Sequence, residues 1–100
     1  MNRRLLLSPG AESDLLDVWS YTAEHFGVLQ ADRYLEQLVA GLRSCASRPN
    51  RGRRRDDLRP GYRSVLLARH VAFFTVRDDA IVVQRVLHGS MDPDQNLGDA

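Results

Sequence analysis

One almost continuously apolar run, Ile81 to Leu87, most constrains how this chain can fold. Only Gln84 and Arg85 interrupt it. Such a run is typical of a strand that is covered on both faces and therefore lies inside a sheet. The rest of the chain must supply the neighbouring strands and the layer that packs on them.

Two amphipathic segments before this strand predict a pair of helices. Ser8 is expected to cap the first helix and Pro9 to take its first position, where a missing N–H costs nothing. Gly27 is expected to end the first helix and Pro49 to follow the second, and the short join predicts an antiparallel helical hairpin. Mostly apolar side chains recur every three or four residues and should face the core, at Ala11, Leu15, Val18, Trp19, Thr22 and Phe26, then at Ala31, Leu35, Leu38, Val39, Leu42 and Ala46.

The remaining elements predict a single α+β domain. Arg3 to Leu7 suits a first strand, and strands are expected at 62–68, 71–77 and 80–88, after an arginine-rich loop at 50–61. Because the turns between the last three strands are short, these strands should be antiparallel neighbours. The predicted order is β-α-α-β-β-β, with the helical hairpin packed on one face of an antiparallel sheet.

The two ends of the chain carry separate expectations. Residues 1–91 should form the one domain, while residues 92–100 have almost nothing to bury and should form a mobile acidic tail. No apolar run reaches the about 20 residues of a membrane span. The run Leu5 to Leu7 is too short for the apolar part of a signal peptide, so we expect a cytoplasmic protein without membrane contact.

The composition points away from metal and cofactor chemistry. Cys45 is the single cysteine, so no internal disulfide can form, and we expect it to be a small buried apolar side chain. His25, His70 and His88 lie on three different predicted elements without the spacing of metal ligands. No glycine-rich phosphate loop is present. We therefore predict no metal site and no cofactor.

Charge is divided unevenly along the chain. Residues 43–69 contain nine arginines and two aspartates, a net charge of +7, whereas residues 11–36 contain six acids and one arginine, a net charge of −5. This division favours charged partners. The run Arg53 to Arg55 would suit nucleic acid or an acidic protein segment, but it lacks the interleaved aromatic residues of a base-stacking surface.

Short motifs follow one another along nearly the whole chain. They are Ala11-x-x-Asp14-Leu15, Tyr21, Gly27, Ala31-x-x-Tyr34, Pro49 with Gly52, Asp57 to Ser64, Arg69-His70 and Arg85 to Asp92. In this order and at these spacings they resemble the ParE branch of the RelE/ParE superfamily, the toxins of bacterial type II toxin–antitoxin pairs. One departure is Ser90, which stands where ParE-like sequences usually carry a basic residue.

The resemblance implies two partners. One is a ParD-like antitoxin that wraps the toxin, and the other is DNA gyrase, which ParE-like toxins inhibit by binding, so that DNA is contacted only through the antitoxin or gyrase. We expect the target to be bound by residues near the last strand and in the arginine-rich loop, namely Arg59, Arg85, His88, Met91 and Asp92. We expect the antitoxin to contact Leu16, Tyr34, Arg63 and Arg69.

Two alternative functions follow from the same residues. In a RelE-type messenger-RNA endoribonuclease, His88 would transfer a proton while Arg85 and Arg63 held phosphate. The sequence offers no convincing second proton-transfer group, so we assign no catalytic residues and expect a binding protein rather than an enzyme. The other alternative is a degenerate, non-toxic module that retains only its antitoxin contact.

Arg85 also has a purely structural interpretation. A charge within an apolar strand must be paired or face solvent, because burying it alone is costly. Asp92 or Asp57 is the partner that the sequence suggests for such a pair.

Overall fold

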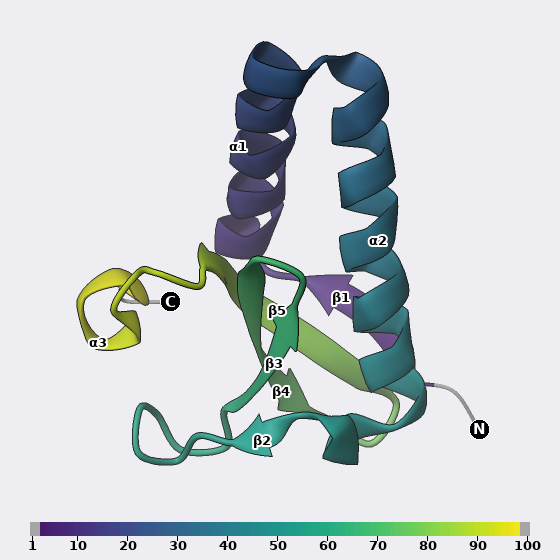
Figure 1. Cartoon of the computed structure of the whole chain (residues 1–100). Helices are drawn as coiled ribbons and strands as arrows, with labels where there is room; N and C mark the ends of the chain where they lie inside the picture. Colours follow the sequence, from purple (N-terminus) through teal and green to yellow (C-terminus); the bar gives the residue numbers. More distant parts are fainter. Residues whose placement is uncertain (1–2, 99–100) are drawn as a thin grey trace.

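Two long helices stand as a hairpin on one side of a five-stranded sheet (Figure 1). The computed structural model describes residues 3–98. In chain order the elements are β1 (Arg4–Leu7), α1 (Pro9–Phe26), α2 (Val28–Ser47), a 3-10 turn η1 (Pro49–Arg51), β2 (Arg53–Arg54), β3 (Arg63–Leu67), β4 (His70–Val76), β5 (Ala80–His88) and α3 (Pro93–Asn96). The predicted α+β class and the helical hairpin are confirmed.

The sheet differs from the prediction in being mixed rather than antiparallel. Its strand order is β1-β5-β4-β3-β2, and β1 runs parallel to β5, with Arg4 opposite Ala80 and Leu7 opposite Val83. A parallel pair is possible here because the helical hairpin and three strands separate β1 from β5 along the chain. The two-residue strand β2, which pairs with β3, was also not predicted, since two residues carry no periodicity.

The main core lies between the hairpin and the sheet. Leu38, Phe74 and Val83 are fully buried at its centre, and Cys45 is buried beside them, so burial raises the pKa of its thiol. Phe26 was predicted to join this core but is 67% exposed. The reason is that the tip of the hairpin projects beyond the sheet, where no strand can cover it (Figure 1).

Ser8 fixes the start of α1 against the sheet. Its Oγ accepts a hydrogen bond from the Ala11 N–H at 3.1 Å, as the predicted N-cap requires, and donates one to the Gln84 carbonyl at 2.7 Å. Gly27 joins the two helices with a φ of 91°, a conformation that side-chain-bearing residues rarely adopt. Both ends of α1 therefore lie where the sequence predicted them.

A second apolar cluster covers the other face of the sheet. Adjacent residues of a strand point to opposite faces, so Phe73 faces away from the hairpin while Phe74 faces it. Phe73 packs with Tyr62, Leu87 and Leu97, and Leu97 is only 3% exposed.

The expectation that residues 92–100 have almost nothing to bury is therefore wrong. Residues 93–96 form α3, which Asp92 caps by accepting a hydrogen bond from the Asp94 N–H at 3.0 Å, and Leu97 then fills the second cluster. A lone leucine among polar residues carries no periodicity from which its burial could be predicted. Residues 99 and 100 lie outside the described part of the chain.

Replacing Leu38 with alanine is expected to lower the free energy of unfolding by about 2–5 kcal/mol, because it leaves a cavity in the main core. Urea unfolding measures this loss. Leu29→Ala is the matched control, since Leu29 lies on the exposed hairpin tip and should change stability by less than about 0.5 kcal/mol. Equal losses in the two variants would contradict the packing described here.

Candidate binding groove

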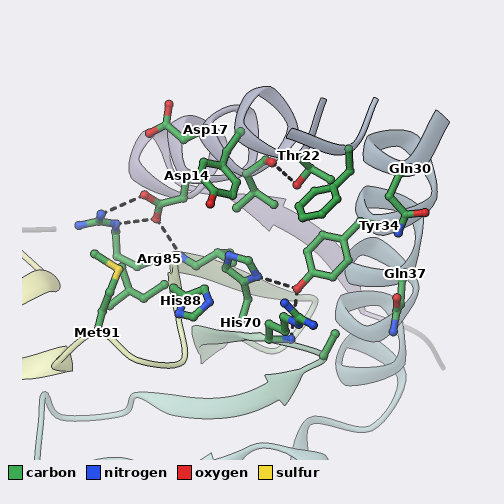
Figure 2. A pocket seen from close by; sticks show the side chains of 17 residues that line it. Asp14, Asp17, Thr22, Gln30, Tyr34, Gln37, His70, Arg85, His88 and Met91 are labelled. Carbon is green, nitrogen blue, oxygen red and sulfur yellow. Dashed lines mark hydrogen bonds and ion pairs between the residues drawn. The ribbon is translucent and has the colours of Figure 1, made fainter. Parts of the chain in front are cut away.

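A groove of about 1120 Å³ opens between the helical hairpin and the neighbouring ends of β4 and β5 (Figure 2). Apolar, polar and charged side chains alternate along its walls. They include Asp14, Asp17, Val18, Tyr21, Thr22 and Phe26 from α1, Gln30, Tyr34 and Gln37 from α2, and Ala68, Arg69, His70, Arg85, Val86, Leu87, His88 and Met91 from the sheet and its connections. Ligand and partner sites are usually concave surfaces that combine apolar walls with a few polar groups, so this groove is the candidate functional site.

A bidentate ion pair between Arg85 and Asp14 closes one end of the groove (Figure 2). Arg85 Nε donates to Asp14 Oδ2 at 2.7 Å and Nη2 donates to Oδ1 at 3.0 Å. The two side chains are 22% and 13% exposed. Hydrogen bonds to Asp14 raise the pKa of Arg85 above the ordinary arginine value, although partial burial opposes this. The sequence suggested Asp92 or Asp57 as the partner of Arg85, but the partner in the structure is Asp14.

The position of Asp14 explains why it is the partner. β1 stops opposite Val83, so the next part of β5 has an edge without a neighbouring strand. α1 passes this edge, and the Val86 N–H donates to Asp14 Oδ2 at 2.9 Å in place of a strand hydrogen bond. Asp14 thus satisfies both a backbone donor and a guanidinium at the same point of β5.

Arg85 and Arg59 hold the C-terminal segment from two sides. Arg85 Nη1 donates to the carbonyls of Asn96 at 2.9 Å and Leu97 at 3.1 Å, and Arg59 Nη2 donates to the carbonyl of Gly98. Arg59 does not line the groove. Of the five residues predicted to bind the target, the structure brings Arg85, His88 and Met91 into the groove and leaves Arg59 and Asp92 outside it.

Two histidines face each other across β4 and β5 in the floor of the groove. His70 lies directly opposite His88, with ring centroids 5.3 Å apart in an edge-to-face arrangement. Nδ1 of His88 accepts hydrogen bonds from the Ser90 N–H at 3.1 Å and from Ser90 Oγ at 2.8 Å. A 2.7 Å hydrogen bond joins Nδ1 of His70 to the Tyr34 hydroxyl. Burial lowers the pKa of His70, and His88 lowers it further.

The residues predicted to bind the antitoxin are divided between two regions. Tyr34 and Arg69 lie together in the groove, where the Arg69 N–H donates to the Tyr34 hydroxyl at 3.1 Å. Leu16 is 68% exposed on α1 but does not line the groove. Arg63 lies in β3, where its Nη1 donates to the Gly52 carbonyl at 2.9 Å.

The three residues assigned to the nuclease alternative do not form one site. His88 and Arg85 line the groove, but Arg63 does not. Arg85 is already bound to a carboxylate and to two carbonyls. Within residues 3–98 no three histidine, cysteine or acidic residues lie close enough to hold a metal ion.

Sequence reasoning missed Asp14 as a groove residue. Asp14 belongs to the helix motif Ala11-x-x-Asp14-Leu15, but its role depends on the unpaired edge of β5, which only the assembled sheet reveals.

No helix within the described residues has the length and apolar character that crossing a membrane requires.

A family model described as "ParE toxin of type II toxin-antitoxin system, parDE" matches residues 5–93. The chain belongs to the ParE toxin family. It is 41% identical over 98 residues to Toxin ParE1 of Mycobacterium tuberculosis, a match that covers 97% of this chain and 100% of that protein. It is 38% identical over 92 residues to Toxin ParE1 of Caulobacter vibrioides, which covers 92% of this chain and 95% of that one.

The fold of this ParE-family chain is also found among solved structures. A structure described as "Chromosomal ParDE TA system from P. aeruginosa" superposes with a TM-score of 0.75 at 22% sequence identity, covering 86% of this chain and 95% of that chain. At this level of identity the likeness concerns the fold alone. The family that the sequence motifs suggested is confirmed by the family model and the relatives.

Replacing His70 with glutamine is expected to reduce the loss of stability at acidic pH. Because the fold lowers the pKa of His70, the unfolded chain binds this proton more readily. The folded chain therefore loses stability as the pH falls below about 6.5, the pKa of histidine in the unfolded chain, towards the lower pKa of His70 in the folded chain. The Tm of the native chain should fall more between about pH 7.5 and about pH 5.5 than the Tm of His70→Gln.

The other groups around His70 stay the same in this comparison. They are Tyr34 from α2, Arg69 from the turn before β4 and His88 from β5. Leu29→Ala is the control, since it changes an exposed side chain of the hairpin tip and removes no titratable group. A pH dependence that is the same in His70→Gln and the native chain would contradict this account.

Proposed function

We propose that this chain inhibits DNA gyrase by binding it and is neutralised by a ParD-like antitoxin. The observation that carries the proposal is that Arg85, His88 and His70, the groove residues best suited to chemistry, are each already bound to a neighbour, namely to Asp14, Ser90 and Tyr34. A largely pre-formed surface suits recognition of a partner. Catalysis of RNA cleavage would instead need a cation that is free to hold phosphate, and Arg85, which the nuclease alternative assigns to this role, is bound to Asp14.

The groove also suits an antitoxin segment. Tyr21 and Phe26 are exposed at its outer end and Arg69 adds a positive charge, which favours an extended or helical segment with apolar and acidic residues. The descriptions of the family and of the P. aeruginosa structure both name a ParDE pair, which supports this partner. We propose that Tyr34 and Arg69 contact the antitoxin in the groove, and that Leu16 and Arg63 contact it where it continues beyond the groove.

For the target we propose a contact centred on the turn that follows β5. His88, Met91 and Asp92 are exposed there. Arg85 and Arg59 would support this contact from behind, because both hold the segment that follows the turn. Since gyrase acts on the chromosome, the proposed place of action is the cytoplasm, with DNA contacted only through gyrase or the antitoxin.

A supercoiling assay with purified gyrase and relaxed plasmid tests the proposal. We expect the chain to reduce supercoiling as its concentration rises and to trap cleaved DNA. Met91→Glu should raise the concentration for half-inhibition by about tenfold or more, the equivalent of about 1.4 kcal/mol of binding. Leu66→Glu is the control, because Leu66 is exposed on β3 and does not line the groove. Unchanged supercoiling with the native chain would rule out gyrase inhibition.

Endoribonuclease activity is the second candidate, and one observation favours it. His70 lies 5.3 Å from His88 between ring centroids, and so supplies a second proton-transfer group that the sequence did not reveal. Induction in cells without antitoxin separates the candidates. We expect growth arrest without new transcript ends. Cuts in translated messages that disappear in His88→Ala would favour the nuclease, and normal growth would favour a non-toxic binding module.

A further inference from the structure

Helix α2 carries a second hollow, of about 440 Å³, on a face that the groove does not use. Its walls are one stripe of residues spaced three or four apart, namely Asp32, Leu35, Glu36, Val39, Ala40 and Arg43. The groove is lined by other positions of the same helix, Gln30, Tyr34 and Gln37. Since successive residues of a helix are turned by about 100°, the two sets point in nearly opposite directions.

The middle of the stripe is formed by short side chains. Val39 is half-buried and Ala40 is exposed, while the long side chains of Glu36 and Arg43 stand exposed on either side of them. Two helices approach each other most closely where short side chains leave room for those of the other helix. A second helix can therefore pack across α2 at Val39 and Ala40.

The charges of the stripe are ordered along the helix. Asp32 and Glu36 lie in its N-terminal half, four residues apart, where like charges repel each other, and Arg43 lies in its C-terminal half. Asp32 accepts a hydrogen bond from the Trp19 indole, but within residues 3–98 none of the three charged side chains forms an ion pair. The stripe thus suits a helix that carries the same charges in the opposite order.

A second copy of α2 that runs antiparallel supplies this order. Glu36 is three residues before Val39, and Arg43 is three residues after Ala40. A two-fold axis between Val39 and Ala40 therefore places Glu36 of each copy opposite Arg43 of the other, and the symmetry makes this contact twice. A parallel pair would instead place like charges opposite each other.

The shape of the molecule favours the same arrangement. The hairpin tip projects beyond the sheet, whereas the other end of α2 lies against it (Figure 1). Antiparallel packing places the sheet of each copy beside the free tip of the other. Val28 and Leu29, which lie about one turn before Asp32, are 57% and 66% exposed at this tip and would gain a neighbour there.

We propose that the chain forms a two-fold dimer through this stripe, with the two α2 helices antiparallel. The contact rests mainly on one helix from each copy, so we expect a weak dimer with a Kd of about 1–100 µM. The groove stays open on the other side of each hairpin. The dimer is therefore expected whether or not the chain inhibits gyrase.

Sedimentation velocity between about 1 and about 300 µM tests the dimer on the full chain. The native chain should change from the mass of one chain to that of two as its concentration rises. Glu36→Arg and Arg43→Glu each place like charges opposite each other at both contacts, so each should raise the Kd by about tenfold or more. Glu24→Arg is the matched control, because Glu24 is exposed on α1 outside the stripe and should leave the Kd within about threefold of the native value.

Mixing the two single variants tests the antiparallel register itself. Glu36→Arg carries arginine at both positions and Arg43→Glu carries glutamate at both, so both contacts of a mixed pair are complementary. We expect this equimolar mixture to associate within about threefold of the native Kd. Glu24→Arg mixed with Arg43→Glu has the same net charges but lacks this match, and should not restore association. Circular dichroism confirms that the variants fold.

Three results would each overturn the proposal. The first is a native chain that stays monomeric up to about 300 µM, which would leave this face to a different protein. The second is a Kd for Glu36→Arg and Arg43→Glu that equals the native Kd. The third is a mixture of these two variants that associates no better than the mixture of Glu24→Arg with Arg43→Glu.

Discussion

The ion pair between Asp14 and Arg85 is the interaction on which the arrangement of this molecule depends. It joins the first helix to β5, at the point where β1 has ended and β5 would otherwise present an unsatisfied edge. Through its remaining nitrogen, Arg85 also holds the carbonyls of residues 96 and 97. Hydrogen bonds between charged groups contribute about 1.5–3 kcal/mol each, and removing one partner of a shielded pair leaves the other charge uncompensated.

This interaction changes how the polar cluster at the end of β5 is understood. In the sequence, Arg85 and His88 lie close together and are both candidates for contact with a target or for catalysis. In the fold, Arg85 is largely occupied with Asp14 and the C-terminal segment, while His88 and Met91 remain exposed at the groove. For the proposed binding function, this arrangement means that Arg85 holds the backbone behind an exposed contact surface. The same arginine holds the C-terminal segment, whose Leu97 packs on the opposite face of the sheet.

Much of the fold could be predicted because local chemistry determines it. The apolar run predicted β5 with its bounds, and Ser8, Pro9 and Gly27 predicted where α1 begins and ends. The parallel pairing of β1 and β5 was not predicted, since it depends on where the hairpin returns the chain. The exposure of Phe26 was not predicted because helical periodicity does not show how far the sheet extends beneath the helix. The burial of Leu97 was not predicted because a single leucine among polar residues forms no pattern.

The candidate site was only partly predictable. Tyr34, Arg69, Arg85, His88 and Met91 were predicted and do meet in the groove. Their partners were not predicted, because Asp14 lies 71 residues from Arg85 and Tyr34 lies 36 residues from His70 along the chain. Arg59, Arg63 and Asp92 were also predicted to bind a partner, but the fold places all three outside the groove.

A double-mutant cycle on Asp14 and Arg85 tests the central claim most directly. Urea unfolding would be measured for the native chain, Asp14→Asn, Arg85→Gln and the double variant. We predict a coupling free energy of about 1.5 kcal/mol or more between the two positions. In a parallel cycle with Asp17→Asn, an exposed neighbour on the same helix, the losses should add to within about 0.5 kcal/mol. Additive losses at Asp14 and Arg85 would contradict the account, because Arg85 would then be free to act on a target or substrate rather than to hold the fold.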